Sequence, residues 1–270
     1  MSPLAPTHPR LEYGLGGAAG GVALVFVHGL GGLRESWYHQ VLAFKRSHRV
    51  LTYNQRGAGG SEVLDVDATV HDFARDLVGL LNHLGLYRAV FVGVSFGGRV
   101  VQELALGWPG RALGIVLVST SGGGPGQLPG DPVAHDLLRR STTLDAETWS
   151  AGLIPALFGP AFRERHAARL ERLARWWAAH PQPTAGLARQ WQACDSFDRW
   201  ADLPGLRAPA LVIHGTADIL VPPGNGQQLA ACIPGARLAL LEGLGHSPQI
   251  EDPAAFNEVL QGFLREIGCA

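Results

Sequence analysis

Short runs of uninterrupted apolar residues alternate along this chain with segments of helical periodicity. Runs that are apolar at every position suit strands buried on both faces, as in a parallel sheet covered by helices on each side. The alternation therefore predicts an α/β fold with a mostly parallel, doubly wound sheet. The runs lie at residues 22–28, 50–53, 89–94, 114–119 and 210–214, with a shorter candidate at 238–241.

The segments between these runs carry signals for helices. Residues 69–72 (TVHD) have the form of a capping box, and the apolar residues that follow recur on one helical face as far as Leu84. Pro253 stands where proline favours the first turn of a helix. The helices expected from these signals span residues 69–84, 96–106 and 253–267.

The alternation stops between about residues 125 and 200, where no strand-like run is found. This stretch begins in a Gly/Pro-rich linker, GGGPGQLPGDP, and continues in helix-rich sequence that contains most of the tryptophans. We therefore predict a helical cap over residues 125–200. It would be inserted into an α/β core made of residues 1–124 and 201–270.

Composition limits the partners and the compartment. The formal net charge of the 270 residues is −1 and there is no basic run, which argues against nucleic acid or an acidic membrane as a partner. The three cysteines (Cys194, Cys232 and Cys269) are scattered, which fits a reducing compartment better than a disulfide framework. No signal-peptide pattern and no run of about 18 apolar residues is present. We expect a cytoplasmic protein; the sequence carries no signal of its oligomeric state.

The most specific motif is Gly-Val-Ser-Phe-Gly at residues 93–97, which matches G-x-S-x-G. It follows an apolar run and opens a predicted helix, as a sharp strand-to-helix turn that exposes a serine hydroxyl requires. The motif predicts Ser95 as a nucleophile. The alternative is a glycine-rich turn whose serine only caps the helix.

A serine hydroxyl is a weak nucleophile unless a base accepts its proton and an acid orients that base. His246 follows the last strand candidate, and Asp218 follows the run at 210–214, so both are predicted at the carboxyl edge of the sheet. The chain order Ser95, Asp218, His246 is the one expected for this arrangement. Asp252 is an alternative acid, and a histidine or aspartate in a loop can also be merely structural.

Two further sets of residues are predicted to surround the nucleophile. A developing oxyanion needs two backbone N–H donors, which we assign to Leu30, in the Gly-rich loop after residue 28, and to Phe96. We expect His28 to orient that loop and not to act as a second base. The predicted pocket residues are Trp37, Trp176 and Trp177, although a tryptophan at helical spacing often belongs to a cap's own core.

Five segments of the chain form a recognisable set: HGLGG at 28–32, YNQRGAGGSE at 53–62, GVSFGG at 93–98, HGTADILVP at 214–222 and GLGHS at 243–247. Taken together, they resemble the capped esterase, lactonase and C–C hydrolase group of the α/β-hydrolase fold. The resemblance implies that the family's nucleophile, acid and base fall on Ser95, Asp218 and His246, and its oxyanion donors on Leu30 and Phe96.

Two positions refine the resemblance. Asn54 stands where family members usually carry an aspartate, in a motif that is structural in the family, so the change bears on local packing. Serine at position 95, where haloalkane dehalogenases and epoxide hydrolases of this fold carry aspartate, argues against those activities.

The predicted function is hydrolysis of a small, apolar ester by two-step acyl transfer. The apolar substrate is inferred from the aromatic residues of the cap. No cofactor or metal is expected, since patterns such as H-E-x-x-H and C-x-x-C are missing from the sequence. One alternative is a lactone or C–C bond hydrolase, or a cofactor-free haloperoxidase, that uses the same triad. The other is a ligand-binding receptor or regulator without turnover.

Overall fold

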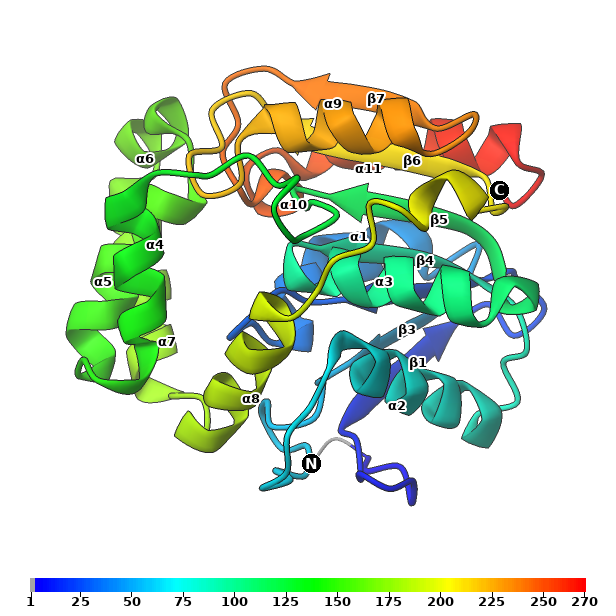
Figure 1. Ribbon diagram of the computed structural model, residues 1–270, viewed down its shortest axis with the longest axis horizontal. Helices are drawn as coiled ribbons and strands as arrows, with labels where there is room; N and C mark the ends of the chain where they lie inside the picture. Colours follow the sequence, from blue (N-terminus) through cyan, green and yellow to red (C-terminus); the bar gives the residue numbers. More distant parts are fainter. Residues whose placement is uncertain (1–2) are drawn as a thin grey trace.

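One mixed sheet organises the molecule (Figure 1). The computed structural model describes residues 3–270, and within them seven strands form a sheet in the order β1-β3-β2-β4-β5-β6-β7. β1 pairs antiparallel with β3, and the other neighbouring pairs are parallel, which confirms the predicted α/β class. The strands are β1 (Tyr13–Gly17), β2 (Ala23–Val27), β3 (Arg49–Tyr53), β4 (Ala89–Val94), β5 (Ala112–Val118), β6 (Ala210–Gly215) and β7 (Arg237–Leu241).

The strands β2 to β7 are the six that the apolar runs predict, with small shifts at their ends. β1 was not predicted, because its sequence YGLGG is mostly glycine, which is depleted in strands. It forms because each of its residues pairs with β3, from Tyr13 opposite Tyr53 to Gly17 opposite Arg49. Tertiary pairing thus supplies what the local sequence lacks.

Helices cover both faces of the sheet (Figure 1). α2, α3 and α9 share a core with one face, and α1 and α11 share a core with the other. Along β2 the side chains alternate, so that Val25 faces the first core and Phe26 the second. Each such buried side chain contributes about 1.5–3 kcal/mol. The helices of the core are α1 (Tyr38–Phe44), α2 (Val70–His83), α3 (Phe96–Gly107), α9 (Pro223–Cys232), α10 (Pro248–Glu251) and α11 (Pro253–Glu266).

Among the described residues, the connection between β5 and β6 contains helices, turns and loops but no strand of the sheet. Figure 1 shows these helices stacked to one side of the sheet, beside the ends of its parallel strands. No helix within residues 3–270 is both long enough and apolar enough to cross a membrane. The helices of this connection are α4 (Pro132–Arg139), α5 (Ala146–Leu157), α6 (Pro160–Arg165), α7 (Ala167–Ala179) and α8 (Thr184–Asp195). Short 3₁₀ turns complete the chain at η1 (Arg34–Trp37), η2 (Pro109–Arg111), η3 (Arg140–Thr142) and η4 (Leu203–Gly205).

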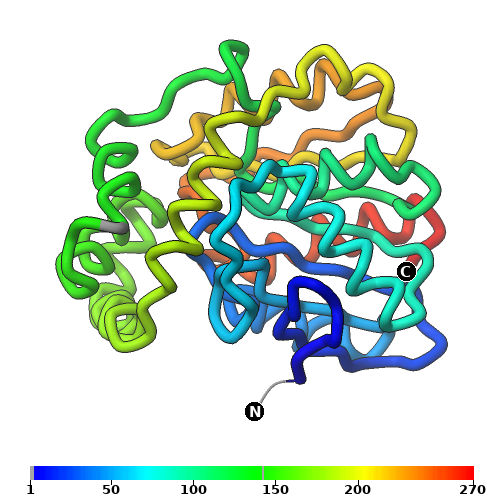
Figure 2. Tube along the Cα trace, turned by 60° about the horizontal axis from the view of Figure 1, so that its bottom comes forward, coloured from blue at the N-terminus to red at the C-terminus, as the bar shows by residue number. Residues whose placement is uncertain are grey.

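The chain enters and leaves this helical insertion at one narrow place, which we call the neck (residues 122–124 and 197–200). Gly123 forms an antiparallel bridge with Asp198, and Arg199 N donates to Gly122 O at 2.9 Å. The indole Nε1–H of Trp200 donates to Gly123 O at 2.6 Å. The tube view shows the helices of residues 132–179 gathered on one side, with the chain of α8 leading back along the core (Figure 2).

Candidate active site

A strained turn holds Ser95 at the end of β4. The strand ends at Val94 and α3 begins at Phe96, so Ser95 alone makes the turn. Its φ of 55° and ψ of −119° cost a residue other than glycine about 1–3 kcal/mol. Ser95 N donates to Val118 O of β5 at 2.8 Å, and Thr120 Oγ1 donates to the Ser95 carbonyl at 2.7 Å. The end of β5 therefore fixes the strained residue.

The two glycines of the G-x-S-x-G motif are required by space. A Cβ on Gly93 would lie 2.3 Å from Gly97 O, and a Cβ on Gly97 would lie 2.3 Å from Val27 O of β2. Both obstacles are backbone atoms, which cannot move aside as a flexible side chain could. The glycines thus allow α3 to start directly against the strand ends.

A carboxylate and an imidazole meet where β6 and β7 end. His246 Nδ1 lies 2.8 Å from Asp218 Oδ2, and both residues are buried. Asp218 Oδ1 accepts the N–H groups of Leu220 at 3.0 Å and Val221 at 2.9 Å. Burial favours a raised pKa for Asp218, but the charges and hydrogen bonds of His246 and His214 outweigh it and lower the pKa. Asp218 is therefore an anion that leaves His246 Nε2 free as an acceptor.

His214 is a second partner of this carboxylate that sequence reasoning missed. Its ring is fully buried, with Nε2 2.7 Å from Val221 O and 3.3 Å from Asp218 Oδ2. The available signal was a polar ring within the apolar run of β6, four residues before the aspartate. In the part of the chain that the structure describes, no three His, Cys, Asp or Glu side chains are grouped to hold a metal ion.

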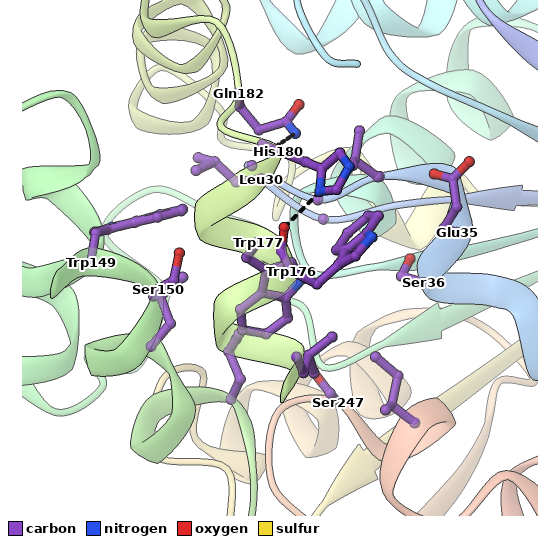
Figure 3. Close-up of a pocket in the computed structure, with 18 of the residues that line it drawn as sticks. Leu30, Glu35, Ser36, Trp149, Ser150, Trp176, Trp177, His180, Gln182 and Ser247 are labelled. Atoms are coloured by element: carbon purple, nitrogen blue, oxygen red, sulfur yellow. Dashed lines mark hydrogen bonds between the residues drawn. The ribbon is translucent and has the colours of Figure 1, made fainter. Parts of the chain in front are cut away.

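Ser95 and His246 line one cavity between the core and the helical insertion, with a volume of about 700 Å³. This is a size that holds small organic ligands. Among residues 3–270, no hydrogen bond joins Ser95 Oγ to His246; such contacts often tighten only when substrate binds. Figure 3 shows side chains of this wall from three elements: Trp149 and Ser150 of α5, Trp176 and Trp177 of α7, and Glu35 and Ser36 of η1.

The structure separates the three tryptophans that were predicted for the pocket. Trp176 and Trp177 line the cavity. Trp37 instead lies wholly in the core, with its ring 5.0 Å from that of Phe26 and 6.2 Å from that of Phe256. The 3₁₀ turn η1 directs this ring toward the sheet, so the expectation that Trp37 edges the pocket is wrong.

Two backbone N–H groups next to the serine are free to donate. Within residues 3–270, neither Leu30 N nor Phe96 N donates a hydrogen bond. The loop that carries Leu30 packs against the elbow, since a Cβ on Gly29 would lie 3.3 Å from Ser95 Cβ. Gly31 N, in the same loop, donates to Gln190 Oε1 of α8 at 2.9 Å. The loop is thus held between core and insertion.

His28 fixes the start of that loop. Its Nε2 accepts Gln55 N at 3.0 Å, which leaves Nδ1 to donate to Gly29 O at 2.8 Å. Burial lowers the pKa of His28 to about 4, although the bond to Gly29 acts in the other direction. The ring is therefore neutral near pH 7 and is occupied on both nitrogens, as a structural role requires.

Glu251 joins the histidine loop to the helical insertion. Its Oε1 accepts Gly245 N at 2.8 Å, and its Oε2 accepts Gly159 N, at the start of α6, at 2.9 Å. Burial raises the pKa of this carboxyl by more than the two N–H groups lower it. Ser247 N also donates to Leu157 O at 3.0 Å. The residues on both sides of the site's histidine are thus fixed to the α5–α6 junction.

The sequence of this chain is similar to those of known hydrolases. A family model described as the alpha/beta hydrolase family matches residues 24–259. A Pseudomonas savastanoi protein named "Putative carbamate hydrolase RutD" is 35% identical over 243 residues, which cover 89% of this chain and 93% of that protein. A protein named 3-oxoadipate enol-lactonase 2, from Acinetobacter baylyi, is 29% identical over 94% of this chain and 93% of its own length.

The fold is similar to that of solved structures over nearly the whole chain. A hydrolase from Pseudomonas aeruginosa is 32% identical with a TM-score of 0.86, and the match covers 97% of this chain and 98% of that one. The enol-lactonase from Burkholderia xenovorans is 29% identical with a TM-score of 0.87, over 97% of this chain and 100% of that one.

Proposed function

This chain belongs to the alpha/beta hydrolase family and is a hydrolase, and we propose that it cleaves a small, apolar ester through Ser95, His246 and Asp218. The observation that carries the proposal is the buried hydrogen bond between His246 Nδ1 and Asp218 Oδ2, beside a cavity that Ser95 and His246 line together. The strained turn at Ser95 and the chain order of the three residues support the same roles.

In the proposed first step, Ser95 Oγ forms a bond to the substrate's carbonyl carbon while His246 Nε2 accepts its proton. The carbonyl oxygen becomes an oxyanion and accepts the N–H groups of Leu30 and Phe96. The anionic Asp218 stabilises the imidazolium. The bond from carbon to the leaving oxygen then breaks, His246 returns the proton to that oxygen, and an acyl group remains on Ser95.

In the second step, a water molecule attacks the carbonyl carbon of the acyl group on Ser95. His246 Nε2 accepts a proton from the water as its oxygen bonds to the acyl carbon, and the same two N–H groups hold the oxyanion. The bond to Ser95 Oγ breaks, Oγ regains the proton from the imidazolium, and a carboxylic acid leaves. His246 is thus the group that accepts and returns the proton in each step of the cycle.

We propose that residues 125–200 act as a cap over this chemistry, on a core of residues 1–124 and 201–270. The cavity wall is built from both parts, since α5 and α7 face the loop after β2 and the histidine loop. Cover from these helices would limit the access of bulk water to the reacting carbonyl, which strengthens hydrogen bonds to the oxyanion.

The size of the cavity bears on the substrate. A volume of about 700 Å³ is larger than a minimal ester or carbamate requires, which supports a substrate with an extended apolar part. A lactone is the second candidate, favoured by the likeness to the Burkholderia enol-lactonase over 97% of this chain. Ester, lactone and carbamate all present a carbonyl carbon bonded to a leaving heteroatom, so the same two steps serve each.

The test combines a fluorophosphonate probe with a panel of 4-nitrophenyl esters and lactones. Ser95→Ala should abolish labelling and lower kcat by roughly 10⁴-fold or more. Ser196→Ala is the matched control, since that hydroxyl only donates to Ala193 O at the end of α8, and it should keep both properties. Near-normal kcat in Ser95→Ala would assign the nucleophile elsewhere. A wild-type protein that neither labels nor hydrolyses the panel would be a binding protein.

A further inference from the structure

One face of α7 contributes a continuous stripe to the cavity wall. The residues of this stripe follow helical spacing, so they lie along one side of the helix. Its first part is basic and its second part is apolar and aromatic. The stripe consists of Arg169, Arg172, Leu173, Trp176 and Trp177, and His180 extends it just after the last residue of α7.

The two arginines of the stripe have no acidic partner in the part of the chain that the structure describes. Within residues 3–270, Arg169 Nη2 donates to His39 Nε2 at 3.3 Å, and its guanidinium lies 5.8 Å from the centre of the Phe162 ring. Both of these partners are uncharged groups. The side chain of Arg172, which is exposed, forms neither a hydrogen bond nor an ion pair in the described part of the chain.

The remaining charged groups of the wall do not compensate them. The wall's acidic residue, Glu35, already pairs with Arg34 at 3.0 Å. Partial burial, aided by the charge of Arg169, lowers the pKa of His39. The neutral ring therefore accepts a hydrogen bond from the guanidinium group. The wall of this mostly apolar cavity thus carries positive charge that no acidic side chain in the described part of the chain neutralises.

We propose that the cavity binds a substrate whose far end carries a carboxylate, held by Arg169 and Arg172 while its apolar part lies against Leu173 and the tryptophans. This inference rests on the proposed function, because it names the class of ester or lactone that Ser95 attacks. Residues three apart on a helix rise about 4.5 Å and lie on one face. Two guanidinium groups at that spacing can bind one carboxylate, whose planar shape matches their donors.

The test uses pairs of substrates that differ only at the far end. Mono-4-nitrophenyl esters of succinate, glutarate and adipate are each compared with the analogue that ends in a carboxamide. The wild-type enzyme should prefer one of the carboxylates, and the ratio of kcat/KM within that pair should fall about tenfold in Arg169→Gln or Arg172→Gln. Because the ratio compares two substrates on one protein, it is independent of how much of a variant folds.

Arg175→Gln is the matched control. Arg175 lies on the same helix but outside the cavity wall, and its partner is Glu171 at 4.0 Å. The ratio of kcat/KM for carboxylate over carboxamide in this variant should therefore equal that of the wild type. Added salt should reduce the wild-type preference, since it screens the partly exposed charges.

Two results would overturn the inference. One is a wild-type enzyme that hydrolyses each carboxamide as well as its carboxylate partner, and the other is a ratio that Arg169→Gln and Arg172→Gln leave unchanged. In either case, hydrolysis that still depends on Ser95 would leave the proposed function intact. Hydrolysis of both substrates by Ser95→Ala would instead contradict the proposed function itself.

Discussion

At the residue scale, Asp218 uses its two oxygens for two purposes. Oδ1 is held by the backbone N–H groups of Leu220 and Val221, and Oδ2 accepts His246 Nδ1. The carboxylate cannot rotate without losing the backbone bonds. The fixed oxygen therefore determines which nitrogen of His246 carries the proton.

Asp218→Asn should lower kcat by about 10⁴-fold with little loss of stability, because an amide nitrogen facing Nδ1 no longer enforces that tautomer. Asp252→Asn is the control, since Asp252 accepts Ala255 N at the start of α11 at 3.0 Å. It should keep kcat. Steady-state kinetics and thermal melting of both variants measure these effects, and a mild loss at Asp218 with a severe loss at Asp252 would transfer the role.

His28 should make the protein's stability depend on pH. Its pKa is about 4 in the folded chain, against 6.5 when exposed, so between these values the unfolded chain binds a proton that the folded chain does not. The stability from this residue is full above pH 6.5 and is lost as the pH falls toward 4.

The free energy of unfolding of the wild type should therefore fall by about 2–3 kcal/mol more than that of His28→Gln between pH 7 and pH 4.5. Urea unfolding at intervals across this range measures both slopes. Parallel slopes for the two proteins would mean that the buried ring of His28 titrates normally.

At the element scale, the sequence predicted best where one element passes directly into the next. The run of β4 and the glycines around Ser95 admit only a sharp turn, and the structure places α3 there from Phe96. Trp37 shows the opposite case. It stands close to the predicted oxyanion loop in the sequence, but the direction of its ring depends on η1 and on Phe256, far along the chain. Partners so distant in sequence leave no local signal.

The link between α10 and the insertion can be tested through Glu251. In Glu251→Gln an NH₂ group faces one of the two backbone N–H donors, so the loop of His246 and the α5–α6 junction lose a shared anchor. We expect kcat to fall by about 10- to 100-fold with KM little changed, because displacing the base slows the chemical step.

Active-site titration with the fluorophosphonate probe corrects these rates for the folded fraction. Glu103→Gln is the control: Glu103 is also buried, but it pairs with Arg199 and His71. It should lose stability and keep kcat per titrated site. Equal kcat values for the two variants would show that Glu251 only stabilises the fold.

At the scale of the whole molecule, the sequence located the helical insertion between β5 and β6 but not the shape of the cavity. A break in strand–helix alternation identified the helical insertion, because that signal is a property of one long segment. The wall of the cavity joins η1, α5, α7 and the histidine loop, and their approach depends on packing. The pairing of Gly159 with Glu251 or of Gly31 with Gln190 leaves no pattern that a single sequence reveals.

If the cap forms the pocket, its tryptophans should control selectivity. Trp176→Leu and Trp177→Leu should each shift the relative kcat/KM among acyl chain lengths by about tenfold, and should reduce the fluorescence change on binding an apolar substrate analogue. Trp200→Phe is the control, because Trp200 belongs to the neck. Unchanged selectivity in both cap variants, with no fluorescence response in the wild type, would mean that the cap does not shape the site.

The neck has a consequence for how such a protein could diversify. Because Gly123 and Asp198 are bridged, the whole helical segment starts and finishes at one point of the sheet. A replacement of different length or composition would begin and end at the same two residues and leave every strand in register. One contiguous stretch of the gene could then be exchanged for another, and the repertoire of molecules admitted would change while Ser95 and Asp218 stay where they are. The replacement would still have to offer backbone partners to Glu251 and Ser247, which fix the loop of His246.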